Sequence, residues 1–182
     1  MENERRDIRS QSIKYKKLQT LMYHINKETL IKEHQKQNNN KASGIDKMTK
    51  EKYETNLYNN IDNLLQRMKT FSYKPQAVRR TYIPKANGKL RPLGIPAYED
   101  KLVQGVMANI LNEVYEPRFL DCSYGFRPNR SCHDAISRIK KSIMTRPVNY
   151  ILDADIKGFF DNVDHKWLIK FLENDIEDKN FI

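Results

Sequence analysis

Four carboxylates lie close together in Asp153-Ala154-Asp155-Ile156-Lys157-Gly158-Phe159-Phe160-Asp161-Asn162-Val163-Asp164. The short apolar run 150–152 leads straight into them, and such a run predicts a buried strand. A strand that ends in acids can hold a hard metal ion at the edge of a sheet. Mg²⁺ prefers oxygen ligands and is usually held by one or two carboxylates together with substrate phosphates. The segment therefore predicts a magnesium site of the kind that nucleotidyl transfer uses.

The positive charge of the chain is concentrated in its first half. The 182 residues carry 33 Lys and Arg against 23 Asp and Glu, a net charge of +10. Residues 1–100 hold 21 bases and 11 acids, whereas residues 101–182 hold 12 of each. The stretch 63–98 contains eight bases and no acid. A basic stretch without any acid favours binding of a polyanionic partner. A basic face that is merely solvated is the less favoured interpretation.

The remaining bulk features exclude other classes of protein. Cys122 and Cys132 have neither metal-ligand spacing nor a nearby pair of histidines, so we expect reduced packing thiols. No stretch approaches the roughly 18 apolar residues of a membrane span, and the amino terminus has no apolar signal region. We expect a protein of the cytoplasm that does not associate with membranes.

Helical periodicity predicts most of the elements that must position the acidic segment. Apolar residues recur at helical spacing over 11–33, 49–70 and 100–115, and the Gln/Asn/Lys-rich stretch 34–44 is expected to be a flexible loop. Thr49 is a candidate N-cap for the second of these helices. Ser131 begins a capping-box-like start of another helix, and Asp164 is expected to cap the last one.

A β-hairpin is predicted between these helices. Residues 78–85 alternate as a strand, Asn87-Gly88 signals a tight turn, and residues 89–95 form the return strand. Three prolines, Pro84, Pro92 and Pro96, limit how far this ribbon can pair on both sides. We therefore expect a protruding two-stranded finger.

Four blocks, in this order, resemble group II intron-encoded reverse transcriptases, or maturases. They are Ser43-Gly44-Ile45-Asp46, the hairpin from Arg80 to Pro96, Ser123-Tyr124-Gly125-Phe126-Arg127-Pro128-Asn129-Arg130-Ser131 with His133 and Ala135, and Asp155 to His165. The resemblance covers residues 43–172. It implies an α+β fold, a helix-rich fingers–palm fragment of a right-hand polymerase with a protruding β-hairpin and a palm strand. Its parts would be an N-terminal helical extension and loop (1–40), fingers (41–145) and the start of the palm (146–182).

The resemblance also implies the roles of the site residues. Asp155 would be the first catalytic aspartate and would bind both Mg²⁺ ions, and the backbone carbonyl of Ile156 would add a ligand. Lys85 and Arg91 would hold the triphosphate of the incoming dNTP. Phe160 would be the gate that excludes a ribose 2′-OH, and Asp161 would frame the nucleotide site. Asp153 points to the same sheet face as Asp155 but is expected to be supporting or solvated.

Five basic residues are expected to contact nucleic acid: Arg79, Arg80, Lys89, Arg127 and Arg130. For Arg127 and Arg130, a purely local role is an equal alternative, in which they pin the loop of the Gly-Phe-Arg-Pro block to the palm. The implied partners are structured intron RNA, an RNA template and a DNA primer, and a homodimer is possible.

The Tyr-x-Asp-Asp motif that supplies further carboxylates in this family is absent from the sequence. We therefore expect the longer parent to be an RNA-directed DNA polymerase and residues 1–182 to be inactive alone. Two alternatives stay open at this point. The first is an RNA-binding splicing module without polymerisation, and the second is a bacterial reverse transcriptase of a retroelement or defence system that is unrelated to introns.

Overall fold

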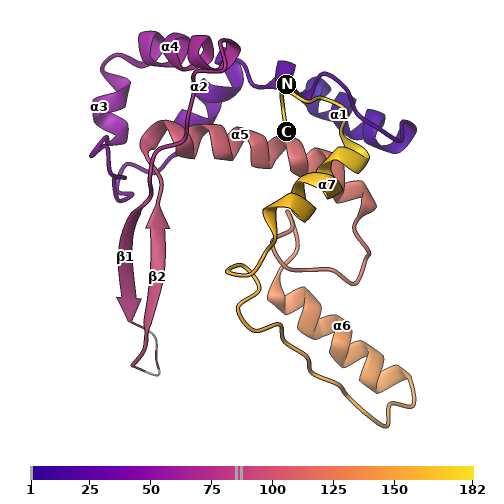
Figure 1. The fold of residues 1–182 in the computed structure, drawn as a ribbon. Helices are drawn as coiled ribbons and strands as arrows, with labels where there is room; N and C mark the ends of the chain where they lie inside the picture. The colour runs from indigo at the N-terminus through magenta and orange to yellow at the C-terminus, as the bar shows by residue number, and fades with distance from the viewer. Residues whose placement is uncertain (1, 85, 87) are drawn as a thin grey trace. The chain divides into compact units, whose positions relative to one another are not determined.

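The computed structural model describes residues 2–84, 86 and 88–182, which form two compact units. One unit comprises residues 20–110 and the other comprises residues 1–19 with 111–182. Helix α5 (Tyr98–Tyr115) contributes its first turns to the former unit and its last residues to the latter. Figure 1 shows the order of the elements along the chain.

The unit of residues 20–110 is a set of helices with a two-stranded arm (Figure 1). Its helices are η1 (Leu21–His24), α2 (Lys27–Lys36), α3 (Lys50–Glu54), α4 (Leu57–Lys69) and most of α5. Their buried side chains pack into one core, to which α4 and α5 contribute apolar residues at helical spacing and α3 contributes Tyr53. The buried members are Leu21, Ile25, Leu30, Tyr53, Ile61, Leu64, Leu102, Val103, Val106 and Ile110.

The predicted single helix over 11–33 is wrong, because the chain turns between Lys14 and Lys27. Thr20 adopts a left-handed conformation with φ 62°, which an α-helix cannot include. Asn26 then starts α2 with a capping box, in which its side chain accepts from the Thr29 amide and its own amide donates to the Thr29 hydroxyl. The predicted helix over 49–70 is likewise divided into α3 and α4 at Thr55 and Asn56, although Thr49 caps α3 as expected.

The loop after α2 is tied to its surroundings through its carbonyl groups. Helix α2 continues to Lys36, so the first part of the predicted flexible loop 34–44 is helical. Lys50 then donates from its ammonium group to the carbonyls of Gln35 and Gln37, at 3.2 and 2.8 Å. Lys101 donates to the carbonyl of Ala42 at 2.6 Å.

The amino end of α5 gathers three carboxylates. The Asp46 carboxylate accepts from the amide of Tyr98 at 2.8 Å and so caps the helix. It replaces a local N-cap side chain, because the preceding residue, Ala97, has no side-chain group that can accept a hydrogen bond. Glu99 pairs with Arg67 of α4. Asp100 is buried and accepts from the Tyr73 hydroxyl at 2.6 Å and from a backbone amide of the segment before the hairpin at 2.9 Å. The positive end of the helix dipole favours all three charges.

The predicted hairpin is confirmed as strands β1 (Arg79–Pro84) and β2 (Leu90–Ile95), which pair antiparallel from Arg79↔Ile95 to Pro84↔Leu90. Gly88 of the connecting turn has φ 76°, a conformation that glycine adopts without steric cost. Asn87, the other residue of the predicted turn, lies outside the described residues. Nearly every strand position is exposed, so the ribbon projects from its unit as expected.

The other unit joins the amino-terminal segment to residues 111–182. Helix α1 (Glu2–Lys14) buries Ile8, and the Ser12 hydroxyl donates to the carbonyl of Val114 at 2.6 Å. Leu18 forms a parallel bridge with Ile176, just after α7 (His165–Asp175), and both side chains are buried. A short helix, η2 (Glu116–Arg118), and α6 (Cys132–Thr145) lie between these segments in the sequence.

The predicted strand at 149–155 is wrong. These residues form no strand, and Leu152 is 92% exposed. A strand needs a neighbouring strand to satisfy its amides and carbonyls, and the sheet in the described part of the chain is the β1–β2 ribbon. The apolar faces of α6 and α7 are exposed as well, although Ser131 and Asp164 cap these helices as predicted.

None of the described helices combines the length and the apolar character that crossing a bilayer requires.

Burial makes His34 sensitive to pH. The ring is 1% exposed, its Nδ1 lies 2.8 Å from the Tyr98 hydroxyl, and its Nε2 has no hydrogen-bond partner among the described residues. Burial lowers the pKa of His34, and Lys50 lowers it further, while Glu54 opposes the shift. The folded chain therefore holds this imidazole neutral at a pH at which the unfolded chain would protonate it.

The free energy of unfolding should therefore fall as the pH drops below about 6.5, the ordinary histidine value, and continue to fall until the lowered pKa of His34 is passed. Above that window His34 contributes no pH dependence. Comparing the Tm at about pH 7.5 and about pH 5.5 in the wild type and in His34→Gln isolates this contribution. The variant should lose less stability than the wild type on acidification, and an equal loss in both would contradict the assignment.

Gly44 lies where a side chain cannot fit. A Cβ there would lie 2.4 Å from the carbonyl oxygen of Pro96 and 2.7 Å from Cα of Ala97, both backbone atoms. Gly44→Ala should therefore lower the free energy of unfolding by about 1–3 kcal/mol through overpacking. Gly125 is the matched control, because a Cβ there meets nothing within 4 Å. Urea denaturation measures both variants, and similar losses would show that the close approach at Gly44 does not matter.

Candidate nucleotide and nucleic-acid site

The register of the hairpin sorts its basic residues onto two faces. Side chains alternate across a strand, and directly paired residues lie on the same face. Arg91 pairs with Ile83, whereas Arg80 pairs with Gly94 and lies on the face that carries Tyr82. Arg80 and Arg91 are both exposed and therefore project from opposite faces of one ribbon. The register therefore places one guanidinium on each face of the hairpin.

The other predicted hairpin residues have different surroundings. Arg79 donates from Nε and Nη2 to the carbonyl of Ser43, at 3.0 and 2.8 Å, so its guanidinium fastens the base of the hairpin to the loop before α3. Lys89 is exposed and directly precedes β2. Lys85 lies outside the described residues.

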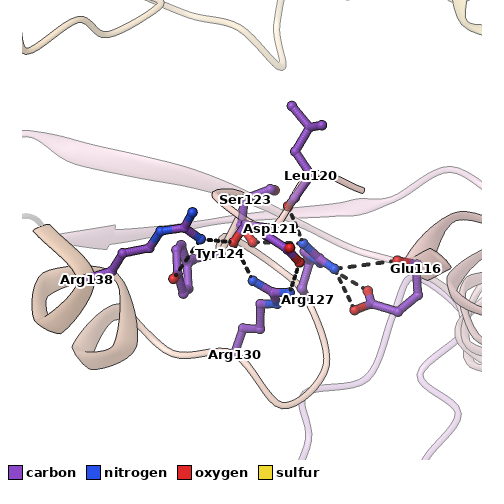
Figure 2. A network of polar contacts seen from close by, with 8 residues as sticks. All are labelled: Glu116, Leu120, Asp121, Ser123, Tyr124, Arg127, Arg130 and Arg138. Atoms are coloured by element: carbon purple, nitrogen blue, oxygen red, sulfur yellow. Dashed lines mark hydrogen bonds and ion pairs between the residues drawn. The ribbon is translucent and has the colours of Figure 1, made fainter. Parts of the chain in front are cut away.

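The Gly-Phe-Arg-Pro loop is held by its own arginines (Figure 2). The Arg127 side chain is buried and donates to both carboxylate oxygens of Glu116, at 3.2 and 2.8 Å. It also donates to the carbonyls of Leu120 and Ser123, at 2.8 and 2.9 Å. The hydrogen bonds to Glu116 raise the pKa of Arg127. The same hydrogen bonds lower the pKa of Glu116. A guanidinium with five donors in a fixed fork suits such a cage, because it can satisfy several acceptors at once.

Two further arginines converge on Asp121 of the same loop (Figure 2). Arg130 donates to the Asp121 carbonyl at 2.7 Å and pairs with its carboxylate at 3.3 Å. Arg138 of α6 donates to the same carbonyl at 2.6 Å and to the hydroxyl of Tyr124 at 3.5 Å. The described partners of Arg127 and Arg130 lie in residues 116–124, so these arginines hold the loop internally, and none of their described contacts ties it to residues 146–182, the predicted palm. The sequence alone did not identify Arg138 or Glu116. Arg138 binds a backbone carbonyl and a tyrosine hydroxyl, and Glu116 binds an arginine eleven residues further along the chain, so no local motif marks either residue.

The cage leaves one aromatic side chain pointing outward. Phe126, next to the caged Arg127, has φ 57° and is 98% exposed. A left-handed conformation is costly for a residue with a Cβ. The hydrogen bonds of Arg127 on one side of it therefore help to hold the loop in a strained shape.

The acidic segment is exposed and forms a turn rather than a strand end. Asp153, Asp155 and Ile156 are all exposed. Gly158 has φ 64°, its carbonyl accepts from the Asp161 amide at 3.1 Å, and the Asn162 side chain donates to the same carbonyl at 2.7 Å.

The two phenylalanines of this segment lie edge to face. Their ring centroids are 5.3 Å apart, and Phe160 is 78% exposed.

The donors near Asp155 fit Mg²⁺ in kind but not in number. A carboxylate and a backbone carbonyl are hard oxygen ligands, which this ion prefers. Among the residues that the structure describes, no three His, Cys, Asp or Glu side chains gather closely enough to hold a metal ion. Two ions would need more ligands than these residues bring together.

A family model for reverse transcriptase (RNA-dependent DNA polymerase) matches residues 83–179, more than half of the chain, which include the end of β1, all of β2 and Asp155. The chain belongs to the reverse transcriptase family.

Within that family the chain is similar to intron-encoded proteins, which confirms the resemblance found in the sequence. It is 47% identical over 119 residues to the group II intron-encoded protein LtrA of Lactococcus lactis, covering 65% of this chain and 20% of LtrA. It is 38% identical over 143 residues to protein YkfC of Escherichia coli, covering 76% of this chain and 37% of that protein. The nuclear intron maturase 2 of Arabidopsis thaliana is 30% identical over 87 residues, 47% of this chain and 11% of the maturase. The chain thus spans less than two fifths of the length of each of these relatives.

The contacts predict opposite outcomes for Arg80 and Arg127. Arg80→Gln removes an exposed charge, so the dependence of log K on log salt for binding a short single-stranded RNA should become shallower by about 0.7. Arg127→Gln removes the hydrogen bonds that hold the loop together, so the Tm should fall. The dependence of log K on log salt should stay unchanged.

Anisotropy of a labelled RNA across a salt series, together with thermal unfolding, distinguishes the two. A shallower slope in Arg127→Gln at unchanged Tm would show that this arginine contacts phosphate after all.

Proposed function

We propose that the chain provides the fingers and the first part of the palm of an RNA-directed DNA polymerase that also binds intron RNA. The observation that carries the proposal is the separation of Arg91 and Arg80 onto opposite faces of one exposed ribbon, whose return strand lies in the segment that matches the reverse transcriptase family. The reaction would be the in-line attack of a primer 3′-hydroxyl on a dNTP, with pyrophosphate leaving.

Each face of the hairpin has a separate task in this proposal. The face of Arg91 would hold the triphosphate, because a guanidinium fork matches phosphate oxygens, and the sequence offers Lys85 as a second cation for this task. The face of Arg80 and Tyr82 would contact the template, since an exposed aromatic ring next to a cation suits both stacking and phosphate contact. Lys89 would add charge near the turn. Arg79 would act indirectly, by fastening the base of the ribbon to Ser43.

The acidic segment would form the catalytic end of the site. The carboxylate of Asp155 and the carbonyl of Ile156 would hold Mg²⁺, which supplies stabilisation of the charge that develops on the transferred phosphoryl group. Further carboxylates would have to complete the ligand set. Because the described residues do not gather three such side chains, we propose that residues 1–182 do not catalyse the reaction alone.

Phe160 would select deoxyribose. A rigid ring under C2′ leaves no room for a hydroxyl group, and Phe160 is exposed and held against Phe159 by an edge-to-face contact. The amide of Asp161 donates to the Gly158 carbonyl in the turn, and Asp161 would help to frame the nucleotide site.

A second function, RNA binding that assists splicing without polymerisation, is favoured by the charge distribution. The whole excess of +10 lies in residues 1–100, and not in the half that carries Asp155. The names of several relatives refer to introns, and one is a maturase. We propose that both functions coexist in the full protein, in a bacterial cytoplasm such as LtrA and YkfC suggest.

Primer extension by a polymerase that contains this segment tests the assignments. Arg91→Ala should raise the KM for dNTP by about tenfold or more, because it removes a charge-assisted contact with phosphate. Phe160→Ala should increase ribonucleotide incorporation and leave the KM for dNTP nearly unchanged.

Phe159→Ala is the matched control for Phe160, because its ring belongs to the same aromatic pair. Equal ribonucleotide incorporation in both phenylalanine variants would remove the gate assignment. Unchanged KM in Arg91→Ala would remove the triphosphate assignment.

A further inference from the structure

A cavity of about 520 Å³ lies in the unit of residues 20–110, apart from the hairpin and the acidic segment. Its apolar walls come from η1 and the residue that follows it, Met22, Tyr23 and Ile25, and from Leu65 and Met68 of α4. Cavities of roughly 300–1,000 Å³ with mainly apolar walls are the usual binding places for small organic groups. No role assigned so far uses this one.

The wall that contains Tyr23 is held in place by the turn before α2. Asn26 accepts from the Thr29 amide at 3.1 Å and donates from its side chain to the carbonyl of Tyr23 at 3.3 Å. The capping box therefore fixes the backbone at Tyr23, whose side chain is nonetheless 75% exposed. An exposed aromatic ring on a held backbone, at the side of an apolar cavity, can stack on a planar group.

Positive charge dominates the rim. Lys27 and Lys69 both line the cavity, and the lining acid, Asp62, is already paired with Lys27 at 2.7 Å. From Asn63 to Tyr98 the sequence contains no acid. The rim thus has an excess of cation beside Leu65 and Met68, which suits a planar apolar group that is attached to phosphate.

We propose that this cavity binds an unpaired RNA base, with the base stacked on Tyr23 and the flanking phosphates near Lys69 and Lys27. The inference rests on the proposed RNA binding and adds a specific place for it. Stacking on an aromatic side chain tolerates any base, because every base has a π face. An apolar protein side chain would fill the same walls, but it would make no use of the lysines at the rim.

The test measures binding of a labelled RNA hairpin whose loop bases are unpaired, and of the same hairpin with abasic sites in its loop. Tyr23→Ala should weaken binding of the first hairpin by about tenfold, the size of effect expected for one lost stacking contact. It should leave binding of the abasic hairpin unchanged. Lys69→Gln should make the salt dependence shallower by about 0.7.

Tyr15→Ala is the matched control. Tyr15 is exposed like Tyr23, and it too has a lysine nearby, since Nζ of Lys14 lies 5.1 Å from its ring centroid. It does not line the cavity. Binding by Tyr15→Ala should equal that of the wild type, and the Tm of each variant shows that the chain remains folded.

Three outcomes would overturn the proposal. Equal losses in Tyr23→Ala and Tyr15→Ala would show a general contribution of surface tyrosines. Equal binding of intact and abasic hairpins by the wild type would show that no base is bound, while RNA binding itself stands. Failure of the wild type to bind either hairpin would remove the proposed RNA binding together with the cavity's role.

Discussion

The capping of α5 is the interaction on which the unit of residues 20–110 depends. A helix begins with amides that have no partner within the helix, and a buried helix end must find acceptors elsewhere. Asp46 supplies one from the loop after α2, while Glu99 and Asp100 use the same end of the helix to hold Arg67 and the segment before the hairpin. The base of the β-ribbon is thereby joined to the helices, so the ribbon's two faces keep fixed directions relative to that unit's core.

The presence or absence of a nearby acid decides what each arginine does. Arg127 pairs with Glu116, and Arg130 pairs with Asp121. Both arginines therefore stabilise a loop. Arg80 and Arg91 lie in the acid-free stretch on an exposed ribbon, where a carboxylate from the neighbouring sequence cannot neutralise them. Since the same residue type serves both purposes, a count of basic residues overstates the surface that is available to nucleic acid.

The sequence predicted what local physics determines and failed where distant partners decide. The hairpin followed from alternation and from the turn glycine, and Thr49, Ser131 and Asp164 cap helices as their types suggested. The helix predicted over 11–33 ignored the ability of Asn26 to start a new one. The strand predicted at 149–155 assumed a neighbouring strand. For the site, the sequence identified residue types and the family, but it could not show that Arg127 is caged by carbonyl oxygens.

The exposed apolar faces of α6, α7 and the segment 150–152 also affect the thermodynamics of the chain. The heat capacity change of unfolding and the denaturant dependence of stability both scale with the surface that is newly exposed. Because many large apolar side chains already contact water in the folded state, unfolding adds less new surface than is usual for a chain of this length. The free energy of unfolding should therefore change little with temperature and with urea. It should depend mainly on the buried residues of the two units.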